Sequence, residues 1–409
     1  MQNKLVLQIN RIIFCAILIK SCSSEISTSN NQFSLQLYSA LTAKHDGDFS
    51  ISPFPVTKLF AALYAEAGGN DLIKAIRNSP QFPEDISTVV RDYKRVIEDF
   101  SAIESLENIQ SAFLVNDSIV QNFKNILKND LDVTILSTNL SDLDATQNTI
   151  VNWTDHRTNE SAQFLKEHFN ENATTFLLSK SFFEATWVHK FHSSFTKPSP
   201  FYYDETHANQ VDMMFQRARV PYAEIPELDC TAVSLPYNSE TYPQNSSADD
   251  EDFHRLEMII LLPNSRTGLT GLETSLKTYP FSRIPQQFLN TKDMFLYIPK
   301  FNVSSMVDLS EVVSKLGTDS QTSSEGINLS NVTFNGDKNS TVNISKILHF
   351  VKFSVDENGS NASNETSATV PNYSLKYNSP ESFRANRPFI GFLYDQEKHI
   401  ILNIFRKKS

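Results

Sequence analysis

The side chains that most often carry catalysis are scattered through this chain and form no motif with catalytic spacing. The sequence has no Gly-x-Ser-x-Gly turn for a serine nucleophile and no His-Glu-x-x-His pair for zinc. Glu167 and His168 are neighbours in a charged stretch, and we expect both to be solvated. A triad assembled from distant residues stays possible on sequence alone. The pattern favours a protein that is not an enzyme and that binds no metal.

Asparagine is the residue with the clearest chemistry, because Asn-x-Ser/Thr is the acceptor for N-linked glycans. Such triplets are dense along the chain, and three follow one another in the polar stretch 354–370. This density favours passage through the secretory route, although an Asn- and Ser-rich chain also forms some triplets by accident. The candidates expected to carry glycans on surface loops are Asn116, Asn139, Asn172, Asn245, Asn331 and Asn339.

The N-terminus has the pattern of a secretory signal. Lys4 and Arg11 precede an apolar stretch at 12–19, and small residues follow at 22–24. The apolar stretch is short for a membrane span, and Lys20 closes it. We therefore expect residues 1–24 to be a signal peptide and the mature protein to be extracellular.

The chain has three cysteines, of which Cys15 and Cys22 lie in this N-terminal segment. Cys230 then remains alone in a strand-like run, so no disulfide framework is expected. We interpret Cys230 as a small buried hydrophobe rather than a reactive thiol.

Overall composition excludes several classes of partner. The formal net charge of the 409 residues is −11, and no Lys/Arg run with interleaved aromatics occurs, which argues against nucleic acid and anionic membranes. None of the 10 glycines forms a phosphate-binding loop, so no nucleotide cofactor is expected. The apolar content of 40% is enough for a large packed core.

The secondary structure predicted to position any site differs between the N-terminal and C-terminal parts of the chain. Residues 33–66 are predicted to form a helix, a short strand, a Ser-Pro turn and a second helix, and residues 86–105 have helical spacing. Strand, helix and strand are expected within 109–136, followed by a helix over 145–158.

After Thr175 short apolar runs, rich in β-branched and aromatic residues, predict strands. Helices followed by strands favour an α+β fold. We expect residues 238–254 to form an acidic loop insertion, and residues 25–409 to form one domain.

Several segments resemble, in order, the serpins, the serine protease inhibitor family. They are "FSISPFPVTKLFAALYAEAGG", "FLLSKSFFEATWVHKF", "VSLPY", "MIILLPN", "LYIPKFNVSSMVDLSEVVSKLG" and "FRANRPFIGFLYD". The resemblance covers about 33–407 and implies an α+β fold with a large mixed central sheet, two smaller sheets and an exposed reactive-centre loop.

The resemblance also implies a function. A serpin inhibits a serine protease as a suicide substrate: its loop is cleaved, an acyl-enzyme forms, and the loop inserts into the central sheet. By family spacing the hinge and loop occupy about 357–377, and the reactive bond joins Tyr373 to Ser374. A tyrosine at this position favours a chymotrypsin-like partner, whereas a longer loop would present Lys376 to a trypsin-like enzyme. No cofactor is implied, and a monomer is expected.

The family pattern assigns the hinge to Glu357, Gly359, Ser360, Ala362, Asn364 and Thr366. Side chains of an inserting strand alternate between two faces. Ser360, Ala362, Asn364 and Thr366 would then turn toward the core, while Asn361 and Glu365 would turn outward. A glycan on Asn364 would block insertion, so a non-inhibitory binding, carrier or decoy glycoprotein is the alternative reading.

The remaining positions that the family pattern marks lie within the sheet. The resemblance implies that Glu357 pairs with Lys300 above Trp187. The alternative is that the two residues are unrelated surface charges. His349, Ser52 and Pro53 match the middle of the sheet. Three positions there depart from the family: Pro55, Val151 and Ser179.

Overall fold

Helices cover the N-terminal part of the protein. The computed structural model describes residues 25–66, 80–116, 121–154, 159–168, 175–238, 254–315, 332–333, 341–342, 344–360 and 380–409. The first elements are α2 (Glu25–Thr42), β1 (Phe49–Ile51), α3 (Pro53–Glu66) and α5 (Ile86–Phe100). In α5 the buried side chains recur every three or four residues, at Val89, Tyr93, Val96 and Phe100, and Asp85 caps the helix by accepting from the Ser87 amide.

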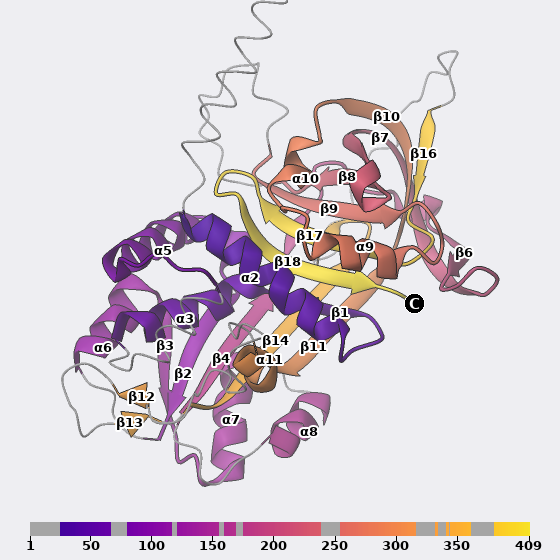
Figure 1. The fold of residues 1–409 in the computed structure, drawn as a ribbon. Helices are drawn as coiled ribbons and strands as arrows, with labels where there is room; N and C mark the ends of the chain where they lie inside the picture. The colour runs from indigo at the N-terminus through magenta and orange to yellow at the C-terminus, as the bar shows by residue number, and fades with distance from the viewer. Residues whose placement is uncertain are drawn as a thin grey trace, which may run out of the picture.

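A mixed five-stranded sheet lies at the centre of the molecule (Figure 1). Its strand order is β11-β14-β4-β2-β3, with β14 parallel to β4 and β2 parallel to β3. The other two pairs are antiparallel. Bounds are β2 (Ile109–Val115), β3 (Val133–Ser137), β4 (Thr175–Phe182), β11 (Phe301–Asp308) and β14 (Ile344–Val355).

Two helices pack on the lower part of this sheet (Figure 1). These are α7 (Leu143–Thr154) and α8 (Asn159–His168). Ile150 of α7 and Leu165 of α8 join Leu178 of β4 and Phe350 of β14 in one apolar cluster. Short α6 (Gln121–Asn125) runs into a π-helical turn at Ile126–Asp130 before β3.

Two further sheets share the long strand β7 (Ala208–Ile225) and together form one continuous set of nine strands. One has the order β1-β18-β17-β9-β8-β7, and the other joins β7 to β6, β10 and β16. Bounds are β6 (Lys197–Tyr202), β8 (Cys230–Pro236), β9 (Leu256–Pro263), β10 (Thr291–Pro299), β16 (Glu381–Arg384), β17 (Phe389–Asp395) and β18 (Ile400–Lys407).

Shorter elements connect these layers. The helices are α9 (Leu269–Leu276), α10 (Arg283–Gln286) and α11 (Ser310–Lys315), with 3-10 turns at Glu104–Leu106, Ser193–Phe195 and Pro226–Leu228. The short strands are β5 (Ala185–Thr186), β12 (Val332–Thr333), β13 (Thr341–Val342) and β15 (Gly359–Ser360).

The predicted α+β class, with a mixed central sheet and two smaller sheets, is confirmed. The helix predicted over 145–158 is α7, described over Leu143–Thr154, and a further helix that was not predicted, α8, occupies Asn159–His168. Glu167 and His168 therefore lie on a helix, where His168 Nδ1 is 2.8 Å from the Phe164 carbonyl oxygen. The signal segment 1–24 lies outside the described residues, as do residues 239–253 of the predicted acidic insertion 238–254.

Candidate functional site

The two parallel strands β14 and β4 are direct neighbours along their length. Ile344 pairs with Thr175 at one end and Lys352 with Phe182 at the other, so no strand lies between them. The chain leaves β14 at Val355 and reverses direction within four residues. This reversal makes the next strand, β15, antiparallel, which is the direction a strand needs if it is to lie between β14 and β4.

The reversal is a tight turn built by Asp356. Its Oδ1 accepts hydrogen bonds from the amides of Asn358 (2.7 Å) and Gly359 (3.1 Å), and its own amide donates to the Gly359 carbonyl oxygen (2.9 Å). A Cβ atom at Gly359 would lie 1.9 Å from the Ala185 carbonyl oxygen. Glycine is required because the turn passes directly against the backbone of β5.

The strand after this turn already belongs to a sheet. Gly359 pairs with Thr186 and Ser360 with Ala185 in an antiparallel ladder between β15 and β5. Ser360 is fully buried, and its Oγ lies 2.6 Å from the Tyr237 Oη. The predicted inward direction of the Ser360 side chain agrees with this geometry.

Trp187 holds the turn from below. Its amide donates to the Asn358 carbonyl oxygen (2.7 Å) and its Nε1 to the Asp356 carbonyl oxygen (2.9 Å). The indole is 3% exposed and stacks on Tyr237 at 4.3 Å between ring centroids. Trp187 therefore ties the backbone of the turn at 356–359 to the core beneath it.

Glu357 is fixed by three partners at the outer side of the turn. Its Oε2 is 2.8 Å from Lys300 Nζ, its Oε1 accepts from Thr196 Oγ1 (2.7 Å), and its carbonyl oxygen accepts from the Phe191 amide (2.9 Å). Burial alone would raise the pKa of Glu357, but the hydrogen bonds from Lys300 and Thr196 outweigh it and lower that pKa. Glu357 is thus ionised and anchored at neutral pH.

His349 joins β14 to its neighbours in the middle of the sheet. Its Nε2 accepts from the Ser52 amide (2.9 Å), so the ring proton resides on Nδ1 and is donated to Ser179 Oγ (2.7 Å). Ser52 Oγ in turn donates to the Leu402 carbonyl oxygen (2.6 Å), and Pro53 begins α3. His349 and Ser179 are register partners, so their bond spans the β14–β4 seam.

The three departures from the family pattern have partners of their own. Ser179 supplies the hydroxyl that His349 needs, and the Pro55 carbonyl oxygen accepts from Ser111 Oγ of β2 (2.7 Å). Val151 is half-buried against the apolar cluster beneath α7. The middle of the sheet is therefore hydrogen-bonded in spite of the substitutions.

Burial makes His349 sensitive to acid, because it lowers the pKa of the imidazole to about 3. Between pH 6.5 and 3 the unfolded chain binds a proton that the folded chain does not, so folding stability falls as pH falls. At pH 5 this loss is about 2 kcal/mol. We expect His349→Gln to reduce the acid sensitivity seen in urea unfolding at pH 7 and pH 5. If the free energy of unfolding falls by the same amount between pH 7 and pH 5 in both proteins, this role for His349 is contradicted.

Several predicted site residues lie outside the described residues. These are Ala362, Asn364, Thr366, Tyr373, Ser374, Asn172, Asn245, Asn331 and Asn339. Of the other glycosylation candidates, Asn116 and Asn139 are exposed, and their Oδ1 atoms accept from the amides of Leu140 and Ser141 respectively.

Sequence reasoning gave no role to Tyr237, Thr196 and Asp356, which form hydrogen bonds with Ser360, Glu357 and Asn358 respectively. Tyr237 lies within the family-like segment "VSLPY", but nothing in that segment indicates a contact with Ser360, 123 positions away. Asp356 had a recognisable signal, since an aspartate side chain in a turn commonly accepts a hydrogen bond from the backbone amide two residues later, as Asp356 does from Asn358.

Metal ligands and the one described thiol were the remaining candidates for reactive chemistry. The described residues include no group of three His, Cys, Asp or Glu side chains that could hold a metal. Cys230 is buried, and burial raises the pKa of its thiol to about 12, which agrees with a packing role. Within the part of the chain that the structure describes, no helix is long and apolar enough to cross a membrane.

Comparison with known proteins places this geometry in context. The family model described as Serpin (serine protease inhibitor) matches residues 28–405. Antichymotrypsin-2 of Bombyx mori is 22% identical over 396 residues, covering 92% of this chain and 96% of that protein. Intracellular coagulation inhibitor 1 of Tachypleus tridentatus is 25% identical over 388 residues, covering 92% and 87%.

Solved structures with similarly low sequence identity have the same fold. Serpin48 of Tenebrio molitor superimposes with a TM-score of 0.74 at 22% identity and covers 94% of this chain and 98% of its own. Human thyroxine-binding globulin, solved in complex with thyroine, also has a TM-score of 0.74, at 19% identity and with coverage of 94% and 98%.

Proposed function

The chain belongs to the serpin family, and on that premise we propose that it inhibits a serine endopeptidase by loop cleavage and insertion. One observation carries the proposal. The hinge strand β15 already pairs with β5, beyond the end of β4, in the antiparallel direction that an inserted strand requires. Insertion would add further residues to this two-residue ladder, so the entering strand would not have to begin a new ladder.

The chemical step belongs to the protease. Its serine attacks the carbonyl carbon of Tyr373, the bond to Ser374 breaks, and Tyr373 remains attached to the protease as an ester. The released amine becomes the N-terminus of the segment that begins at Ser374. The inhibitor contributes no catalytic residue.

Insertion then separates β14 from β4. The strand that enters must break their parallel ladder and, with it, the His349–Ser179 hydrogen bond that spans the seam. Trp187, Lys300 and Thr196 keep the hinge turn above the seam in place until that happens. The proposed roles of these residues are therefore to hold the sheet closed and the hinge aligned.

Incubation with chymotrypsin tests both the mechanism and the proposed bond. We expect a complex that survives SDS, because the ester is covalent, and a released peptide that begins at Ser374. Trypsin at the same concentration is the matched control and should form less complex. A released peptide that begins at Tyr377 would instead place the reactive bond after Lys376, and cleavage without any complex would contradict inhibition.

A second candidate is a non-inhibitory carrier, binding or decoy glycoprotein. It is favoured by the acceptor triplets at Asn361 and Asn364, because a glycan on the inward Asn364 would prevent insertion. In that case chymotrypsin would cut the loop and release free protease.

We extend the proposal to secretion. The charged and apolar pattern of residues 1–24 and the density of acceptor triplets support it. A mature chain that begins near residue 25 and carries glycans is the observable consequence.

A further inference from the structure

Strands β4 and β5 follow one another on one side of the seam, and their side chains alternate in a single register. Ser181, Phe183 and Ala185 are buried. Between them, Phe182 is half-buried and Glu184 is exposed. The alternation therefore continues from β4 into β5 without an extra residue. The ladder between β15 and β5 can thus be extended along β4 one residue at a time.

This register places Glu365 of the loop opposite Lys180 of β4. Ser360 pairs with Ala185 in the antiparallel ladder. Glu365 follows Ser360 by five positions, and Lys180 precedes Ala185 by five. Because the partners in an antiparallel ladder run in opposite directions along the chain, the two charged residues become direct neighbours when the strand enters.

Lys180 lies on the face of the sheet that α7 covers. By alternation it shares this face with Leu178, which belongs to the apolar cluster beneath α7 and α8. Its Nζ donates to the Trp153 carbonyl oxygen (2.9 Å) and lies 5.2 Å from the centroid of the Trp153 ring. Lys180 is only 7% exposed. A carboxylate placed beside it would therefore be buried too, and would need both a cation and hydrogen-bond donors.

Trp153 of α7 has such a donor at the same place. Its Nε1 is buried and has no hydrogen-bond partner. A buried donor without an acceptor costs free energy, so an acceptor that reached it would be held strongly. The facing strand β14 brings no acceptor side chain, because the register partner of Lys180 there is Phe350.

We propose that Lys180 and Trp153 form a receiving site for the carboxylate of Glu365, which fills the site only after the loop has entered the sheet. The lysine supplies the positive charge, and the carboxylate supplies the acceptor that the indole Nε1 lacks. Glu365, Lys180 and Trp153 are then positioning residues that fix the register of the inserted strand. This inference rests on the proposed function, since the site is filled only if the loop inserts.

A double-mutant cycle, measured by calorimetry on protein without glycans, tests the pairing. Glu365→Gln removes only the charge and should lower the melting temperature of the chymotrypsin-cleaved protein by about 2 °C or more. In a Lys180→Met background Glu365 would be buried without a cation. There the same change should leave the melting temperature of the cleaved protein unchanged or raise it. An equal loss in both backgrounds would overturn the proposal.

Two further variants test the donor and the position of the charge. Trp153→Phe keeps an aromatic ring but removes Nε1, so it should destabilise the cleaved protein more than the intact one. Ser367→Glu combined with Glu365→Gln moves the charge two residues along the same face, opposite Leu178, which is fully buried among apolar side chains. This pair should not restore the melting temperature, and restoration would contradict a site at Lys180.

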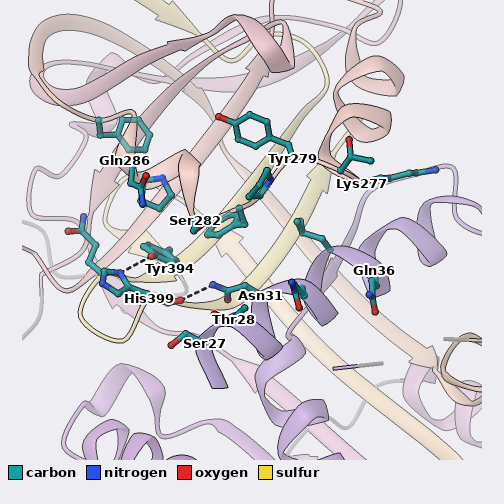
Figure 2. A pocket seen from close by; sticks show the side chains of 18 of the residues that line it. Ser27, Thr28, Asn31, Gln36, Lys277, Tyr279, Ser282, Gln286, Tyr394 and His399 are labelled. Carbon is teal, nitrogen blue, oxygen red and sulfur yellow. Dashed lines mark hydrogen bonds between the residues drawn. The ribbon is translucent and has the colours of Figure 1, made fainter. Parts of the chain in front are cut away.

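None of these variants reaches the cavity of about 1010 Å³ between α2, segment 277–288 and the hairpin of β17 and β18. Figure 2 shows Asn31 of α2 facing Tyr279 across the opening of that cavity. Neither Lys180 nor Trp153 belongs to its lining, so the variants act on the seam alone.

The measurement also separates this site from the proposed function. If cleavage leaves the melting temperature of the wild type unchanged, the loop does not insert, and the proposed function fails together with the site. If cleavage raises the melting temperature equally in the wild type and in Glu365→Gln, the loop inserts and the receiving site alone is refuted.

Discussion

Cleavage within residues 366–374 is expected to raise the melting temperature of the protein by about 10 °C or more. The physical reason is the addition of a full strand to the seam between β14 and β4, which are bonded only to each other there in the intact protein. Each net backbone hydrogen bond contributes about 1 kcal/mol, and an inserted strand gains them along two edges. Calorimetry of the intact and the nicked protein, both without glycans, measures the difference.

The matched variants for this experiment lie on opposite faces of the loop. Asn364→Ala removes the amide expected to turn inward and should leave the intact melting temperature unchanged while insertion becomes faster. Asn361→Ala changes the neighbouring outward face and should have little effect on either. An unchanged melting temperature after cleavage would mean that the loop does not insert, and the carrier or decoy reading would then replace inhibition.

The parts of the fold that were predictable from sequence are those with local signals. Period-2 and continuous apolar runs marked β4, β9, β14 and β17, and the spacing of α5 marked its buried face. The Lys300–Glu357 ion pair followed from the resemblance, because two short motifs fixed both residues without any knowledge of distance.

The parts that were not predictable depend on contacts between distant segments. Strand β18 buries all eight of its residues, Ile400–Lys407, although the last two are basic. Arg406 and Lys407 can be buried because they form ion pairs with Glu273 and Asp48. Nothing in the local pattern of the apolar strand marks Glu257 as a special position. Only the packing of α2 and segment 277–288 against β9 and β17 reveals a buried carboxyl beside a cavity.

The same limit applies to the hinge. Alternation predicted that Ser360 turns inward, but not that it meets Tyr237, because that contact depends on how β5, β8 and β15 converge. The residues proposed as the hinge are therefore held in part by a pair of hydroxyl groups, Ser360 and Tyr237, that no local pattern encodes. Because this pair is buried, a charged side chain at Ser360 should be strongly disruptive.

Ser360→Arg is expected to abolish the SDS-resistant complex while cleavage by chymotrypsin continues. Ser360 is fully buried against Tyr237, which packs between Trp187 and Phe183. A guanidinium placed there would be buried without a carboxylate, at a cost of several kcal/mol. Strand β15 would leave its position beside β5, and the cleaved loop could not seat its first residues. The protein should then be consumed as a substrate, with at least a tenfold loss of complex on a gel.

Two controls separate the burial of charge from the loss of the serine itself, all in unglycosylated protein. Ser360→Ala removes only the hydroxyl, leaves room for the strand and should retain most of the complex. Asn361→Arg places the same charge on the adjacent position, which alternation predicts to face solvent, and should also retain the complex. If Ser360→Arg forms as much complex as the wild type, the buried position of Ser360 has no part in inhibition. The ladder between β15 and β5 would then be a static feature of the intact protein and not the start of the inserted strand.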